Sequence, residues 1–202
     1  PFNGGDLNKD GITDIANVLY AKARTSEDVA LASESKITKL VRADSDRFGV
    51  YGSSAVVAPG GGYTYDLTVS NADNKPLKDI VVFDRLEHAA EDRTDTNDPM
   101  YPFADGSWHG TFQSVVTEGL REEGIAPVIW YNERRDAPFP EGNQKPADVL
   151  TEENGWYRAE DFSAGSSQVK SVAVDLSQTA SGGAFALGSL KSVTFQIKID
   201  RK

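Results

Sequence analysis

Alternation of apolar and polar residues with a period of two is the main pattern in this chain of 202 residues. It is clearest over 193–199, where Val193, Phe195, Ile197 and Ile199 are separated by polar residues. The same alternation runs through 63–70. Because successive side chains of a β-strand point to opposite faces, this pattern predicts strands with one buried face.

Shorter apolar runs predict further strands, and turn-forming residues separate them. These runs cover 37–41, 50–57, 80–83, 111–116, 127–131, 169–176 and 185–187, with a short element at 156–157. Turns are expected at 58–62, 71–76 and 181–183, and the proline-containing segment 132–154 is expected to be a loop. Together these features predict an all-β protein: an antiparallel β-sandwich, Ig-like, with long irregular loops.

Residues 1–37 differ from the β-rich remainder, so we divide the chain into a segment at 1–37 and a domain at 38–202. Within the first segment, 15–24 fits two structures. Ile15, Val18 and Leu19 have the spacing of a short helix, whereas Val18 and Tyr20 suit a strand. Both interpretations stay open.

Charge and composition narrow the classes of function. Asp and Glu outnumber Lys and Arg by 31 to 21, for a net charge of −10, and nucleic-acid binding needs clustered cations instead. The chain has no cysteine, which rules out disulfides, thiolate nucleophiles and Cys-ligated zinc. Since no apolar run approaches the ~18 residues of a membrane helix, we expect no membrane insertion. The sequence begins at Pro1 without a signal peptide, and we interpret it as a piece of a longer protein whose neighbouring domains are partners.

An acidic loop near the amino end has the spacing of a cation site. Oxygen-bearing side chains recur at every second position around a glycine, and the loop would supply the ligands Asp6, Asn8, Asp10, Asp14 and the carbonyl of Ile12. Calcium suits such a loop better than magnesium, because Ca²⁺ accepts six to eight oxygens at flexible distances. The twelfth position is Asn17 rather than the glutamate of an EF-hand, so Asp14 is expected to complete a shorter loop. We therefore predict bound calcium as a cofactor.

This loop resembles the calcium loops of dockerins and of FG-GAP repeats, although it occurs only once. The rest of the chain resembles the adhesin-like β-sandwich repeat domains of Gram-positive bacterial cell-surface proteins, through the segments 59–71, 77–86, 127–131, 169–175 and 193–199. The resemblance implies a secreted module at the bacterial cell surface or cell wall. It would serve adhesion or structural spacing without catalysis, and its partner would be a host or cell-surface protein or glycan.

Many domains of this kind carry an internal isopeptide bond between a lysine and an Asn or Asp. By resemblance, the candidates here are Lys36 or Lys39 with Asp66 or Asp200. Asp66 and Asp200 alternate with the apolar residues of their strands, whereas the bond needs a buried acid. We therefore expect these residues to form a solvated polar face.

Two other functions are alternatives. A carbohydrate-binding module would use exposed aromatic faces. Trp108 and Trp156 are the better candidates because polar residues flank them, whereas Trp130 is expected in the core. A glycoside-active enzyme would need a carboxylate pair, and nothing in the sequence pairs the available acids, which are Glu118, Glu122, Glu123, Glu133, Glu152 and Glu153. His88 and His109 are general-base candidates without a visible partner. We expect no enzymatic activity.

Overall fold

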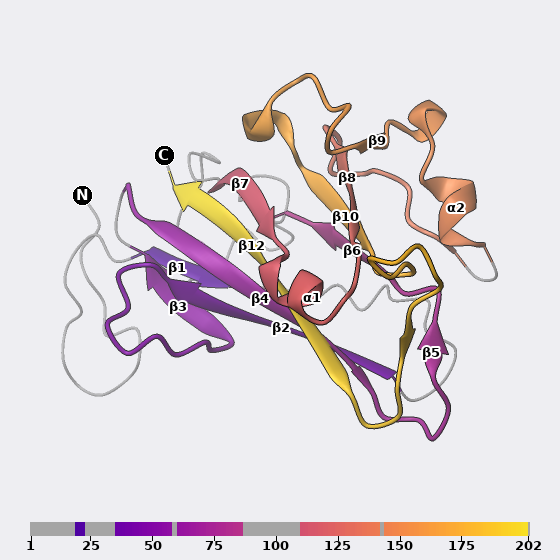
Figure 1. Ribbon diagram of the computed structural model, residues 1–202. Coiled ribbons are helices and arrows are strands. Elements are labelled where there is room, and N and C mark those ends of the chain that lie inside the picture. Colours follow the sequence, from indigo (N-terminus) through magenta and orange to yellow (C-terminus); the bar gives the residue numbers. More distant parts are fainter. Residues whose placement is uncertain (1–18, 23–34, 58–59, 87–109, 142–143, 202) are drawn as a thin grey trace.

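The computed structural model describes residues 19–22, 35–57, 60–86, 110–141 and 144–201. These residues form mostly antiparallel β-strands with few, short helices, which confirms the expected all-β, sandwich-like fold. Two four-stranded sheets face each other across the main apolar core (Figure 1). Among the described residues, no helix is long and apolar enough to cross a membrane.

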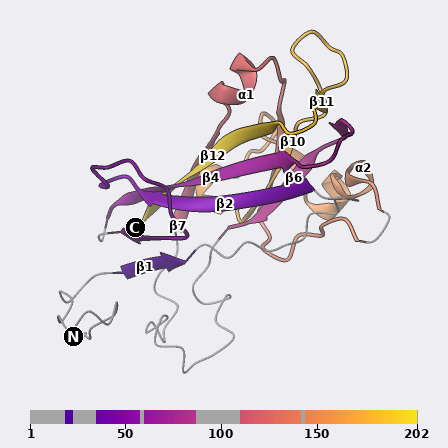
Figure 2. The same ribbon diagram turned by 90° about the horizontal axis from the view of Figure 1, so that it is seen from below.

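The first sheet joins strands from distant parts of the chain. Its spatial order is β2-β4-β12-β7, with β2 at Ser35–Ala43, β4 at Gly62–Asn71, β12 at Ser192–Arg201 and β7 at Gly110–Val116. Strands β2 and β12 are both antiparallel to β4, so they run in the same direction. Seen from below, these three strands lie side by side in one layer (Figure 2).

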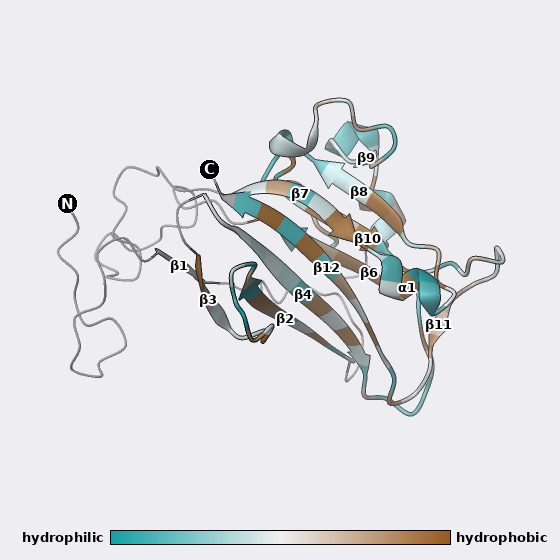
Figure 3. Ribbon diagram, turned by 60° about the vertical axis from the view of Figure 1, so that its left-hand side comes forward, coloured by the Kyte–Doolittle hydropathy of each residue, from teal (hydrophilic) through white to brown (hydrophobic). Residues whose placement is uncertain are grey.

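The predicted alternation is confirmed on the two central strands of this sheet. On β4, Tyr63, Tyr65, Leu67 and Val69 are all buried in the main core. Strand β12 buries the apolar residues of 193–199 in the same core, and Figure 3 shows its alternation as brown and teal bands. Burial of one face fixes the pairing register, because a shift by one residue would turn these side chains outward.

The second sheet has the order β6-β10-β8-β9, with β6 at Val81–Arg85, β10 at Ser171–Asp175, β8 at Val128–Asn132 and β9 at Tyr157–Arg158. Both faces of β10 are covered. Val172 and Val174 pack in the main core, whereas Ala173 belongs to a second apolar cluster on the opposite face. This explains why consecutive residues of β10 are buried without alternation.

The second cluster corrects the prediction of a loop over 132–154. This segment contains helix α2 (Pro146–Val149) and the 3-10 helix η1 (Glu152–Asn154). Its apolar side chains, with those of the residues around it, bury against the second sheet, including Phe139, Val149 and Trp156. Pro146 begins α2, since its fixed φ suits the first turn of a helix.

The remaining elements are short. Strand β1 (Leu19–Lys22) pairs with β3 (Ser54–Val57), and β5 (Leu77–Lys78) pairs with β11 (Ala186–Leu187). Residues 19–22 are therefore strand rather than helix, and the strand expected over 50–57 forms only in its second half. Helix α1 (Glu118–Glu122), which the sequence pattern did not predict, follows β7, and the 3-10 helix η2 (Ser166–Gln168) precedes β10.

Candidate functional site

A buried lysine on β2 is the first unexpected feature of the core. Lys39 lies two residues from Ile37 and two from Val41, which both pack in the main core. The pleat of the strand therefore carries the Lys39 side chain to the same inner face. Its side chain is only 4% exposed. The expectation of a solvated Lys39 is wrong, because the alternation of β2 places it inside.

The partner of Lys39 comes from the second sheet. Asp84 on β6 is in phase with Val82 and Leu86, which are both part of the main core. Its side chain is 9% exposed. The carboxylate therefore reaches the space between the sheets by the same geometry that brings Lys39 there. Sequence reasoning did not name Asp84 as a partner, although its phase with Val82 and Leu86 was a visible signal.

The two groups form a close, two-pronged contact. The Lys39 Nζ lies 2.7 Å from Asp84 Oδ1 and 2.8 Å from Oδ2. The same nitrogen lies 4.2 Å from the centre of the Tyr65 ring, close enough for a cation–π interaction. Burying two charges is costly, and the close pairing compensates for that cost. An amine and a carboxyl group in contact have two chemical outcomes: they stay an ion pair, or they condense to an amide with loss of water.

The other isopeptide candidates lie away from this contact. Lys36 and Asp200 are exposed, as expected for the polar face of their strands. Asp66 accepts a hydrogen bond from Gln196 Nε2 at 3.2 Å on that same outer face. The structure therefore brings together Lys39 and Asp84 and leaves Lys36, Asp66 and Asp200 outside the core.

The aromatic candidates separate into buried and undescribed residues. Trp156 is 0% exposed, packs in the second cluster and donates a hydrogen bond from Nε1 to the Pro138 carbonyl at 3.2 Å. It therefore presents no free aromatic face, which corrects its choice as an exposed candidate. Trp130 packs against the same cluster, as expected, with the Arg158 guanidinium 5.4 Å from its ring centre. Trp108 lies outside the described residues.

The acids weighed for a glycosidase are all exposed. Helix α1 carries Glu118 and Glu122, with Glu123 next to it, whereas η1 carries Glu152 and Glu153, and Glu133 follows β8. Among the described side chains, none of these six acids forms an ion pair that would hold its carboxylate in place. His88 and His109 lie outside the described residues.

The predicted calcium ligands Asp6, Asn8, Asp10, Ile12 and Asp14 also lie outside the described residues. Within the described part of the chain, no group of three or more His, Cys, Asp or Glu side chains is placed to hold a metal ion. The calcium loop therefore stays a prediction from the sequence.

Comparison of the chain with protein-family models, with curated proteins and with solved structures found no match.

Proposed function

We propose that this chain is a non-catalytic, load-bearing module of a bacterial cell-surface protein, serving adhesion or structural spacing. The observation that carries the proposal is the buried Lys39–Asp84 contact, which links a strand of the first sheet to a strand of the second. The resemblance to adhesin-like repeat domains agrees with this role and implies an extracellular location.

The order of the strands favours resistance to pulling. Strands β2 and β12 both pair with β4, over registers that extend from Ser35 to Ala43 and from Ser192 to Asp200. Because β2 and β12 run in the same direction, tension entering before β2 and leaving after β12 acts at opposite ends of the sheet. The hydrogen bonds of an antiparallel pair are perpendicular to its strands. Such tension therefore loads many of them together in shear instead of breaking them one at a time.

A covalent bond between Lys39 and Asp84 would add a second source of resistance to tension, because it would link the two sheets directly. Transfer of one ammonium proton to the carboxylate leaves a neutral amine and a carboxylic acid. The Nζ lone pair of Lys39 then attacks the Asp84 carboxyl carbon, and the amide C–N bond forms. The C–OH bond breaks, and the hydroxyl leaves as water after taking one proton from the nitrogen. No oxidant or reductant is needed. The product is an isopeptide bond between the sheets, closed around the residues between 39 and 84.

Pulling single molecules by handles at the two ends tests this function. An isopeptide bond shields the loop from extension, and its ends are separated by 45 residues. At ~3.3–3.6 Å per extended residue, the unfolded wild-type chain should be shorter by about 150 Å than a Lys39→Met/Asp84→Leu variant.

The wild type is also expected to unfold at a higher force than this double variant. Unfolding of both proteins at the same force and to the same extended length would contradict the load-bearing role. A Lys36→Met variant is the matched control, because Lys36 lies on the outer face of the same strand and is exposed. It should behave as the wild type does.

A further inference from the structure

A pocket at the edge of the second sheet has the features of a small ligand site. Its cavity volume is about 320 Å³, within the range of ligand pockets in proteins. It lies where β8 ends and where the chain leaves β9, and its lining includes Glu133, Tyr157, Phe162 and Ser163. We propose that this pocket binds a neutral saccharide unit. The proposal is independent of the Lys39–Asp84 bond.

The floor of the pocket is rigid. Asn132 is buried, and its Nδ2 donates to the Asn154 carbonyl at 2.9 Å, while its Oδ1 accepts from the Arg134 N–H at 2.8 Å. Gly155 lies against this amide with φ of 78°, and an added Cβ would approach Asn132 Nδ2 to 3.2 Å. The pocket is therefore preformed, which lowers the cost of ordering it around a ligand.

Aromatic rings form one wall of the pocket and connect it to the core. Phe162 packs edge-on against Tyr131 at 5.5 Å between ring centres, and Tyr131 packs in the same way against Phe112 at 5.1 Å. Tyr157, which pairs with Tyr131 across β8 and β9, is 38% exposed. Its ring thus offers an accessible apolar face with a hydroxyl at one end, in a position held by the sheet.

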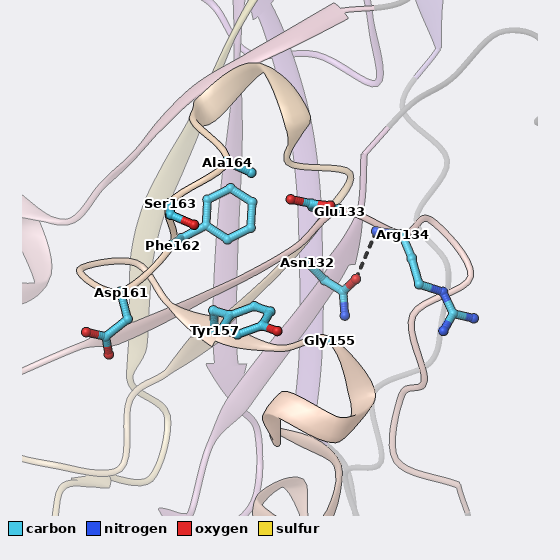
Figure 4. Close-up of a pocket in the computed structure, with 9 residues that line it drawn as sticks. All are labelled: Asn132, Glu133, Arg134, Gly155, Tyr157, Asp161, Phe162, Ser163 and Ala164. Carbon is cyan, nitrogen blue, oxygen red and sulfur yellow. Dashed lines mark hydrogen bonds between the residues drawn. The ribbon is translucent and has the colours of Figure 1, made fainter.

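The charges around the pocket disfavour an anionic ligand. Arg134 is the one cation among the described lining residues, and it pairs with Asp136 at 2.9 and 3.0 Å. This hydrogen bond lowers the pKa of the Asp136 carboxyl. Figure 4 shows Tyr157, Phe162 and Glu133 around the centre of the pocket, whereas Arg134 and Asp161 point away on opposite sides. An anion would therefore meet the Glu133 carboxylate without a free cation.

A neutral, hydroxyl-rich ring matches the hydrogen-bonding groups and the aromatic face that line the pocket. A ligand that covers Glu133 must donate hydrogen bonds to its carboxylate, because burying an unsatisfied charge is costly. Sugar hydroxyls donate such bonds, and they also exchange hydrogen bonds with the hydroxyls of Ser163 and Tyr157. The apolar face of a sugar ring can lie on the Tyr157 ring. The volume of about 320 Å³ suits a ring of this size better than a single ammonium group.

Titration of the full chain with three sugars of matched shape, followed by ¹⁵N NMR, tests the proposal. The probes are glucose, glucuronate and glucosamine, which share one ring configuration and differ mainly in charge. Mannose and galactose are added to sample other neutral hydroxyl patterns. At least one neutral sugar is expected to shift the amide resonances of 132–134 and 155–164. Glucuronate is expected to bind more weakly than the neutral sugars.

Substitutions make the test specific to the pocket. Tyr157→Ala should weaken neutral-sugar binding about two- to tenfold, since aromatic contacts contribute ~0.5–1.5 kcal/mol. Glu133→Ala should weaken binding more than Tyr157→Ala does, because it removes a charged hydrogen-bond acceptor. Phe48→Ala is the matched control, because Phe48 is an aromatic residue that is 89% exposed and lies outside the lining. Binding should be unchanged in that variant. Unshifted resonances with every neutral sugar, binding of glucosamine alone, or equal binding by Tyr157→Ala and the wild type would overturn the proposal.

Discussion

Before any bond joins them, Lys39 and Asp84 each depend on the other, because both are buried and each satisfies the charge of its partner. A buried charge that loses its partner is left without compensation, and this costs more than the pair as a whole contributes. The two residues are therefore expected to be strongly coupled in stability measurements.

Lys39→Met should lower the free energy of unfolding by about 3–5 kcal/mol, since it leaves the Asp84 carboxylate buried in the core without a partner. Adding Asp84→Leu should recover the part of this loss that comes from the unpaired buried charge, because an apolar pair of similar volume removes that charge. The part that comes from the missing covalent link should remain. Denaturant titration measures both effects. Lys36→Met, on the exposed face of the same strand, should change stability by ~0.5 kcal/mol or less. Additive effects of the two core substitutions would refute the coupling.

Tyr131 gives the fold a dependence on high pH. Burial raises the pKa of the Tyr131 hydroxyl above its ordinary value, so the folded state holds this proton more tightly than the unfolded state does. The contribution of Tyr131 is fully present below the unfolded pKa of ~10 and is lost as the pH rises through the folded pKa. Denaturant titrations between pH 8 and 11 should show a smaller decline for Tyr131→Phe than for the wild type. Identical declines would show that Tyr131 does not contribute.

The sequence pattern indicates that the Lys39 side chain points inward, because it is in phase with Ile37 and Val41. It indicates the same for Asp84, which is in phase with Val82. The sequence pattern does not predict that the two side chains are in contact. Periodicity assigns a residue to a face, but it does not say which strands of two different sheets face each other. The register of β6 against β10 and the packing of the sheets decide that.

Strand β7 packs closely against side chains of both β12 and β4 in the first sheet. At Gly110, an added Cβ would collide with the Ile199 side chain of β12 and with the Tyr63 hydroxyl of β4. Glycine is therefore required here for a close approach of backbone to side chain.

Gly110→Ala should lower stability by about 1–3 kcal/mol, because the buried Ile199 and Tyr63 must shift to admit the methyl group. Thermal or denaturant unfolding measures this change. Gly119→Ala is a suitable comparison, since outside the helix the atom nearest to an added Cβ is the Thr194 carbonyl oxygen at 3.9 Å. It should be neutral or slightly stabilising in helix α1. Equal stability of the Gly110→Ala variant and the wild type would contradict this packing.

Elements buried on one face were the predictable ones. Strands β4 and β12 carry the alternating pattern because one face meets the core and the other does not. Helix α2 and the 3-10 helix η1 carry no such pattern, since helices this short form through tertiary contacts rather than through their own sequence. Burial of Trp156 in the second cluster depends on the same contacts, and its polar neighbours gave the opposite indication.

At the scale of the whole molecule, the acidic loop with Asp6, Asn8, Asp10, Ile12 and Asp14 stays a prediction from its spacing. If it binds calcium, removing the metal with EDTA should lower the melting temperature, because a ligand bound only to the folded state stabilises that state. Restoring calcium should reverse the change. An Asp10→Ala variant should melt at the lower temperature with or without EDTA. An unchanged melting temperature in both comparisons would rule the calcium site out.

An isopeptide bond between Lys39 and Asp84 would change the mass of the chain, so the intact mass of the purified, denatured chain decides whether it forms. The wild type should be lighter than the mass of its sequence by one water molecule, the water lost when Lys39 joins Asp84. Lys39→Arg should have its full sequence mass, because the guanidinium does not form this amide. A wild-type chain at its full sequence mass would contradict formation of the bond.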